Sequence, residues 1–300
     1  MPTIVSVTVS LSNQAPDERR ECCTVKGGSV GAAWRGLREI VVNNASNVRR
    51  TLAMARFDLT KRYSGSLLGV GWAVVRPAVF IAVYWFAISV GLRGGKPIEG
   101  VPYILWLIPG IVPWFFLNDA LTIGGTAIRD HRHLVTKMVF PVSTIPVFTV
   151  LALFFAHLML LIPSVLILAL AGPGFTIHTL QLLYYMFATL VFSSVVAIFI
   201  STLSAVSADV GHMVRSFTRV MFWLTPIIWP FSSVHGTLRW AILANPLTYL
   251  IEGYRHALLR PDWLFGSLRY TAYFWGLTGL LMLIAGYLYH RLQPDFADVL

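Results

Sequence analysis

The segment Thr126–Pro141, with the sequence TAIRDHRHLVTKMVFP, is a charged island in a chain that otherwise consists mostly of apolar runs. One apolar run ends near Gly125 and the next begins near Ile145, and each is long enough to cross a bilayer. The island must therefore lie in water on one face of a membrane. Its apolar residues favour a short helix pressed against lipid headgroups or a partner protein, with a basic loop that only sets orientation as the alternative.

The composition of the whole chain is that of a polytopic membrane protein. Of its 300 residues, 56% are hydrophobic and 12% are charged, and this excludes a pair of soluble domains. The net charge of +10 comes largely from the flanks of the apolar runs, which suits an anionic inner leaflet and makes nucleic-acid binding an unnecessary explanation. Cys22 and Cys23 are adjacent and cannot join distant parts of a fold, so we assign them no function.

The apolar runs predict an all-α membrane protein with six transmembrane helices. The expected spans are about 68–92, 103–124, 145–171, 179–204, 214–231 and 270–289. Lys and Arg are more frequent in the segments that this arrangement places in the cytoplasm, and no signal-peptide core precedes the first span, so both termini are expected inside. The remaining segments are a flexible cytoplasmic tail (1–35), an amphipathic interface helix (36–66) that leads into the six-span domain (67–291), and a second cytoplasmic tail (292–300).

The segment 232–268, between the last two spans, has a different character. It contains two short apolar helical candidates, 237–243 and 247–259, separated by Asn245-Pro246. Neither candidate can cross a bilayer alone, so the segment is expected to form a re-entrant or interfacial hairpin on the outer side.

A series of short motifs resembles a known family. The run RYSGSLLGVGW at 62–72, followed by Pro77, looks like the motif that leads into the first span of type-2 ABC permeases that export polysaccharides, namely the O-antigen, capsule and teichoic acid translocators. Further similar blocks follow in order: Lys137–Pro141 with Pro146, Asp209-Val210, Thr225–Ile228, Asn245-Pro246, Tyr254-Arg255 and Phe296–Leu300. The resemblance covers roughly residues 50 to 300. The long N-terminal tail departs from the family pattern.

The resemblance implies a homodimer in the bacterial cytoplasmic membrane, with two copies of a separate ATPase subunit and a channel for a lipid-linked glycan. ATP and Mg²⁺ would bind the ATPase, and the sequence contains no phosphate loop or zinc-type spacing of its own, so no cofactor or metal is expected on this chain. In this reading the charged island is the coupling helix that docks in the ATPase. Its expected contact residues are Arg129, Asp130, His131, Arg132, Leu134, Val135 and Lys137.

The hairpin and some aromatic residues receive roles in the same reading. Glu252 is spaced to reach Arg255 and His256 on one helix face, and charges on a re-entrant helix must be paired or face water, so these three residues are expected to form an external gate. An interfacial helix with its charges among headgroups is the alternative. Sugar rings stack on aromatic faces, so Tyr84, Trp85, Trp114, Phe115 and Trp223 are candidates for lining the channel, although an interfacial aromatic belt explains most such residues.

Two rival functions follow from the same sequence. A type-2 ABC exporter of a drug or lipid is the nearer rival, and an intramembrane glycosyl or acyl transferase is the rival from another class. A transferase needs an acid/base pair or a metal site facing one compartment, but the expected topology disperses Asp119, Glu252 and the island histidines across both faces and the membrane. His131 and His133 beside Asp130 are more typical of a docking face than of a metal site.

Overall fold

The computed structural model describes residues 29–92, 94, 96–137, 141–172, 174–260, 263 and 268–296. In this part of the chain the regular structure is helical, apart from one isolated bridge between Ile98 and Val101. The expected all-α class is therefore confirmed.

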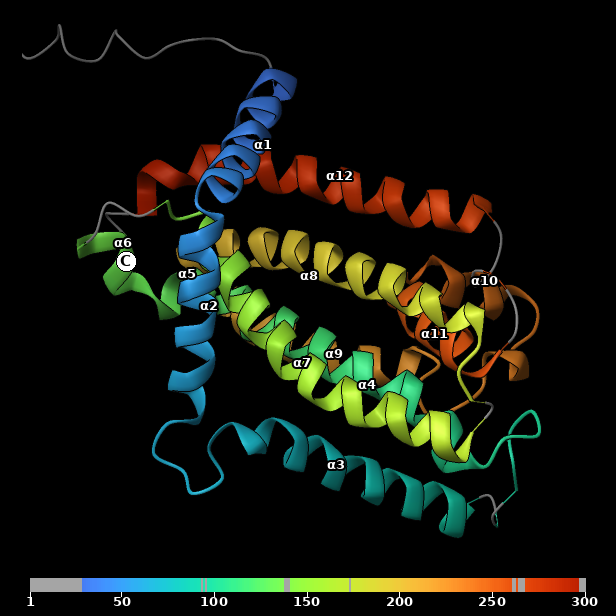
Figure 1. Ribbon diagram of the computed structural model, residues 1–300. Helices are drawn as coiled ribbons and strands as arrows, with labels where there is room; N and C mark the ends of the chain where they lie inside the picture. The colour runs from blue at the N-terminus through green and yellow to red at the C-terminus, as the bar shows by residue number, and fades with distance from the viewer. Residues whose placement is uncertain are drawn as a thin grey trace, which may run out of the picture.

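Five long helices run side by side through the molecule (Figure 1). They are α3 (Trp72–Trp85, continued by a π-helix over Phe86–Leu92), α4 (Tyr103–Thr122), α7 (Thr144–Ala171), α8 (Gln181–Val206) and α12 (Leu268–Leu292). With the short turns that extend them, these helices give five segments that are long and apolar enough to cross a membrane: Gly69–Gly91, Tyr103–Asp130, Thr144–Ala171, Ile177–Val206 and Leu268–Leu292. The chain is a multi-pass membrane protein.

The span expected at 214–231 differs from the helix that forms there. Helix α9 begins earlier, at Ala208, and ends at Leu224 after 17 residues. Thr225 has an extended backbone (φ −93°, ψ 140°), because the ring of the following Pro226 disfavours a helical conformation in the preceding residue. Residues 225–230 are consequently not helical, and the short helix α9 is not one of the five spanning segments.

Two helices cross the ends of the long helices at one end of the molecule (Figure 1). They are α1 (Ser29–Ser46) and α2 (Val48–Tyr63), where the sequence predicts one interface helix over 36–66. The break falls at Asn47, whose side-chain amide donates to the Asn43 carbonyl (2.8 Å) and competes with the helical ladder. Residues 29–35, expected in the flexible tail, belong to α1. The rest of that tail, with Cys22 and Cys23, lies outside the described residues.

Helix α1 packs closely on α12 through two glycines. A Cβ atom at Gly36 would lie 1.9 Å from the carbonyl oxygen of Gly286, so only glycine at this position allows the two backbones to meet.

The opposite end carries the hairpin of α10 (Thr237–Ala244) and α11 (Pro246–Leu259), close to the predicted boundaries. Asn245 caps α11 because its side-chain oxygen accepts from the Leu247 amide (3.0 Å), and Pro246 occupies the first turn. Nearly all of α11 is buried, and a Cβ at Gly253 would meet the ring of Tyr185 at 2.1 Å. Helix α11 is therefore anchored in the protein, whereas α10 exposes most of its residues, including Leu238 and Trp240.

Helix α4 is the centre of the bundle. It buries most of its residues, among them Trp106, Leu107 and Ile111, whereas α3 exposes most of its surface. The remaining short elements are 3₁₀ turns at Gly69–Gly71, Gly124–Thr126, Ile177–Leu180, Phe231–Ser233 and Gln293–Asp295, and helices α5 (Ala127–Asp130) and α6 (Arg132–Lys137). The predicted second tail is partly ordered, since the ring of Phe296 is buried against Tyr289.

Candidate functional site

The charged island forms α5 and α6, which confirms that it contains short helix rather than loop alone. Leu134 is only 6% exposed and packs in one apolar cluster with Leu59 of α2 and Phe148 of α7. The island is therefore pressed against helices of its own chain. This placement corrects the expectation that the Leu134 side chain is offered to a partner. The side chains of Val135 and Lys137 lie outside the described residues.

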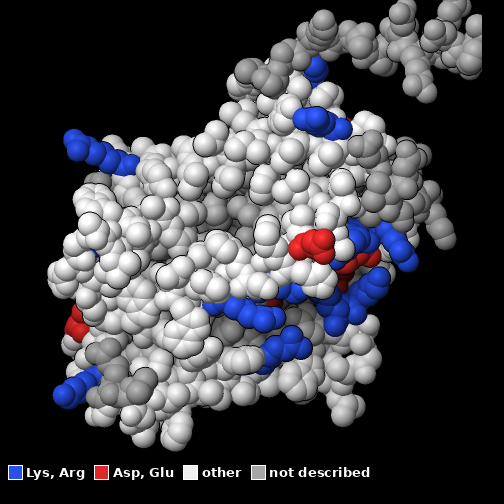
Figure 2. Space-filling view, turned by 180° about the vertical axis from the view of Figure 1, so that it is seen from behind, with Lys and Arg blue, Asp and Glu red and all other residues white. Residues whose placement is uncertain are grey.

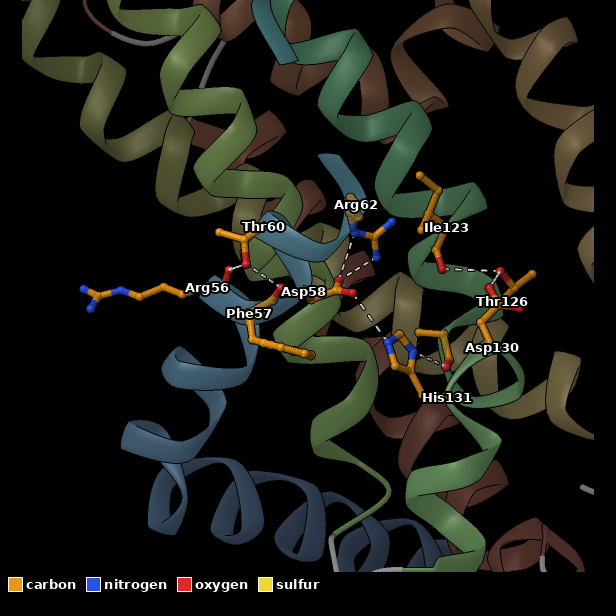
Figure 3. A network of polar contacts seen from close by, with 10 residues as sticks. Arg56, Phe57, Asp58, Thr60, Arg62, Ile123, Thr126, Asp130 and His131 are labelled. Atoms are coloured by element: carbon orange, nitrogen blue, oxygen red, sulfur yellow. Dashed lines mark hydrogen bonds and ion pairs between the residues drawn. The ribbon is translucent and has the colours of Figure 1, made fainter. Parts of the chain in front are cut away.

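An ionic network fixes α2 to the island (Figure 3). Arg62 donates to the carboxylate of Asp58 from Nε (2.9 Å) and Nη2 (2.6 Å), and His131 Nε2 lies 3.5 Å from the other carboxylate oxygen. His131 Nδ1 also lies 3.0 Å from the Ala127 carbonyl oxygen. Burial favours a higher pKa for Asp58, but the His131 hydrogen bond and the Arg62 charge outweigh it, so the pKa is lowered from its ordinary value.

The outward face of the island is polar. Asp130, Arg132 and His133 are exposed, and Thr126 holds the Asp130 carboxylate through a hydrogen bond of 2.6 Å. Arg129 is half-buried at the base of the island. Of the predicted coupling residues, these exposed ones are the ones positioned to meet a second protein. The coupling role itself stays a prediction.

At the opposite end, a buried arginine supports the non-helical segment after α9. Arg255 is 2% exposed and pairs with Glu252, which is 4% exposed. Its guanidinium donates to the Pro226 and Ile227 carbonyl oxygens (3.0 Å each) and lies 3.7 Å from the centroid of Trp106. Irregular backbone at membrane depth must find its hydrogen bonds inside the protein, and Arg255 supplies two of them.

Gly110 of α4 makes room for this contact. A Cβ atom at Gly110 would lie 2.2 Å from Nη2 of Arg255, so a larger residue would displace the guanidinium. Sequence spacing correctly gives the Glu252–Arg255 pair. The two carbonyl acceptors and Gly110 lie far away in the sequence, and no local pattern indicates them.

A polar cleft of about 260 Å³ opens beside this pair. An exposed ion pair joins its rim, Arg260 Nη2 to Glu99 Oε2 at 2.6 Å, and Arg239 lies over the ring of Phe231 at 4.7 Å. The lining residues are Glu99, Trp106, Pro230, Phe231, Ser232, Arg239, Glu252, Arg255, His256 and Arg260. All three predicted gate residues thus border one cleft, but they are buried in its wall, and the more exposed charges of Glu99 and Arg260 were not predicted.

Most of the candidate channel aromatics gather between α3, α4 and α9. Tyr84 and Trp114 both contact Phe222, with ring centroids 5.3 and 5.5 Å away, and Trp223 contacts the same ring at 5.6 Å. Phe115 contacts Phe80 of α3 at 6.3 Å. Trp114 is buried, whereas Trp223 is 63% exposed, and Trp85 is also exposed on α3. Their role as a channel lining stays a prediction.

Comparisons with known proteins agree with this architecture. Residues 49–259 match the family described as ABC-2 type transporter. The chain is 27% identical over 207 residues to the O-antigen export system permease protein RfbA of Myxococcus xanthus, covering 68% of this chain and 78% of that protein. It is 28% identical over 253 residues to a protein of the same name from Klebsiella pneumoniae, covering 81% of this chain and 92% of the relative. Since the family match covers well over half of its length, the chain belongs to the ABC-2 type transporter family.

Proposed function

We propose that this protein is the membrane-spanning subunit of an ATP-driven exporter of a lipid-linked polysaccharide. The relatives named above are O-antigen export permeases that match most of the chain, which favours a glycan over a drug or a simple lipid as the substrate. The observation that carries the proposal is the aromatic group around Phe222, because its partly exposed rings suit sugar stacking.

The proposed topology has six crossings. Helix α9 is about 26 Å long at 1.5 Å per residue, and the non-helical residues 225–230 complete the proposed crossing. The hairpin α10–α11 enters the outer leaflet, and α1 and α2 lie at the inner interface. An even number of crossings leaves both termini on one side, and the basic residues of α2 and the island favour the cytoplasmic side of the inner membrane.

The proposed assembly is a homodimer with its channel between the two copies. Helix α3 exposes Val79 and Val83, its π-helical continuation exposes Phe86, and α9 exposes Phe217 and Trp223. These faces border the aromatic group, so a second copy placed here would enclose it. The other exposed apolar faces would contact lipid.

Two copies of a separate ATPase subunit complete the proposed complex and bind ATP and Mg²⁺. They would dock on the exposed face of the island, Asp130, Arg132 and His133. The permease alone is expected to hydrolyse no ATP, and ATP turnover by the isolated chain after removal of contaminants would contradict this proposal.

The test combines deletion of the protein with an assembly assay. Cells that lack it should accumulate a lipid-linked glycan on the inner side of the membrane, and normal surface glycan in such cells would refute the function. Arg132→Glu should reduce co-purification of the ATPase, while Arg56→Glu, at an exposed basic position of α2 outside the island, should not. Equal recovery of the ATPase with both variants would show that the island face does not dock it.

A further inference from the structure

Two arginines from separate helices converge on one point at the inner end of the bundle. A Cβ atom built at Gly211, in the first turn of α9, would lie 3.5 Å from Nη2 of Arg129 and 3.7 Å from Nη1 of Arg215. The same point lies 3.0 Å from the Thr126 methyl group, so Gly211 allows α9 to pack closely against the turn that precedes α5. The two guanidinium groups lie at the edge of this contact.

Neither arginine has a carboxylate partner among the described residues. The ion pairs in this part of the chain involve Arg62, His131, Arg255 and Arg260. Nη1 of Arg129 is buried without a hydrogen-bond acceptor, and Nη2 of Arg215 contacts the ring nitrogen Nδ1 of His212 at 3.1 Å. Leaving a buried N–H group of a cation without an acceptor costs free energy. The arrangement therefore favours the binding of an anion from outside this chain.

The nearby carboxylates do not fill this role. Asp130 accepts a hydrogen bond from Thr126 at 2.6 Å, and Asp209 is exposed at the start of α9. The first turn of a helix adds a favourable dipole for an anion at Gly211. Neither carboxylate lies within ion-pair distance of Arg129 or Arg215, so the guanidinium nitrogens at this point have no direct counter-charge within the described part of the chain.

The depth of the pair identifies the kind of anion. Arg129 lies at the end of the spanning segment Tyr103–Asp130, and Arg215 is followed on α9 by exposed Phe217, Val220 and Trp223. Most of the Lys and Arg residues seen on this side of the molecule lie toward the end that carries the island, and the adjoining surface is largely uncharged (Figure 2). The pair thus stands where water meets the apolar membrane, which is the level of lipid phosphates.

We propose that Arg129 and Arg215 bind the phosphate of a membrane lipid at Gly211. Guanidinium groups match phosphate oxygens with paired hydrogen bonds, and the acceptor would satisfy the buried Nη1 of Arg129. The phosphate belongs either to an ordinary headgroup or, resting on the proposed function, to the carrier of the lipid-linked glycan. In the second case the site holds the charged end of the substrate at the inner mouth of the exporter.

Binding to the purified full chain tests the site. Polyprenyl monophosphate, phosphatidylglycerol and phosphate-free polyprenol are titrated in detergent, and bound lipid is counted by native mass spectrometry. Arg129→Gln and Arg215→Gln should each weaken phosphate-lipid binding by roughly tenfold or more, as expected for a charge-assisted hydrogen bond, and leave polyprenol binding unchanged. Arg219→Gln, at an exposed position one turn further along α9, is the matched control.

The outcomes separate the possible ligands. Weakened binding of polyprenyl phosphate alone assigns the site to the substrate carrier, and an equal loss for phosphatidylglycerol assigns it to headgroups; both support a phosphate site. Unchanged binding of both lipids overturns it, and if ATPase recovery then falls, the arginines hold an acidic side chain of that partner. If a Gln variant does not fold, Arg215→Lys replaces it, because Lys keeps the charge but loses the paired guanidinium hydrogen bonds. Arg215→Lys should bind the phosphate lipids more weakly than the Arg219→Gln control, and binding as tight as that of the control refutes the site.

The lipid-binding measurement does not depend on transport. Lipid binding is measured without an ATPase or a glycan, so a phosphate site can be present in a protein that exports another substrate. Conversely, surface glycan that persists in cells whose Arg215→Gln protein has lost lipid binding would reject the carrier role of the site and leave the proposed function standing.

Discussion

Replacement of Glu252 by Gln removes one charge of the buried pair and keeps the shape of the side chain. Arg255, 2% exposed, would then be a buried cation without its paired carboxylate, and breaking a buried pair in this way costs about 3–5 kcal/mol. Its contacts to the Pro226 and Ile227 carbonyls and to Trp106 remain, so we expect a loss near the lower limit, about 3 kcal/mol.

A double variant separates the charge effect from the hydrogen bonds. In Glu252→Leu combined with Arg255→Met no buried charge remains, and the penalty comes from two carbonyls without donors, about 1–3 kcal/mol each. Arg255→Met alone leaves both the carbonyls and a buried carboxylate unpaired and should be the least stable variant. The order of stabilities is the discriminating result.

The assay is equilibrium unfolding in mixed micelles with increasing SDS fraction, followed by circular dichroism. A Glu252→Gln protein within about 0.5 kcal/mol of the parent would refute the reasoning, since that is the usual range for surface substitutions. The expected loss also means that reduced export by Glu252→Gln cannot by itself demonstrate an external gate.

Three further predictions concern other parts of the molecule. Because the pKa of Asp58 is lowered in the folded state, its ionised carboxylate stabilises the protein at neutral pH, and this stabilisation is lost as the pH falls below the ordinary aspartate value of 3.8. Unfolding measured against pH should therefore show a loss of stability in acid that is absent in Asp58→Asn. Gly36→Ala should destabilise the packing of α1 on α12 by about 1–3 kcal/mol. The control Gly31→Ala lies on the same helix with nothing within 4 Å of the added Cβ, so it should be neutral or stabilising by up to about 1 kcal/mol. An equal loss of stability in both variants, measured by SDS unfolding, would exclude the close helix crossing as the cause. The exposed ion pair between Arg260 and Glu99 is broken by Arg260→Ala or by Glu99→Ala, and each variant should lower the free energy of unfolding by less than about 1 kcal/mol. If the outer cleft opens during transport, each variant should nevertheless change glycan export. Unchanged export would argue against movement of the cleft.

Local sequence signals predicted the local structure well. Asn245-Pro246 marked the boundary between α10 and α11, because an Asn cap and a proline in the first turn are both start signals for a helix. The i, i+3 spacing likewise gave the Glu252–Arg255 pair. Thr225-Pro226 predicted an interruption of the fifth span, and α9 ends at Leu224, directly before it.

Contacts between distant segments could not be predicted in the same way. Asp58 meets His131 because α2 crosses the island, and Arg255 meets the Pro226 carbonyl because residues 225–230 fold over α11. Hydrophobic periodicity indicates which face of a helix is buried but does not identify the element that covers it. For the same reason the sequence predicted that Leu134 contacts a partner, although its side chain is buried in the core of its own chain.

The segment Tyr103–Asp130 links the two candidate sites physically. It begins beside the outer cleft, where Trp106 contacts Arg255, and ends at the island, where Asp130 precedes His131. Most of α4 is buried among neighbouring helices, so its middle cannot bend without disturbing a packed core. In the proposed complex, a displacement of the island would reach α4 through the buried turn Gly124–Thr126, and from α4 the Trp106 ring that contacts Arg255. Helix α3, with most of its surface exposed, is not tied to that movement in the same way. The parts expected to move together are α4, the island and the inner wall of the outer cleft.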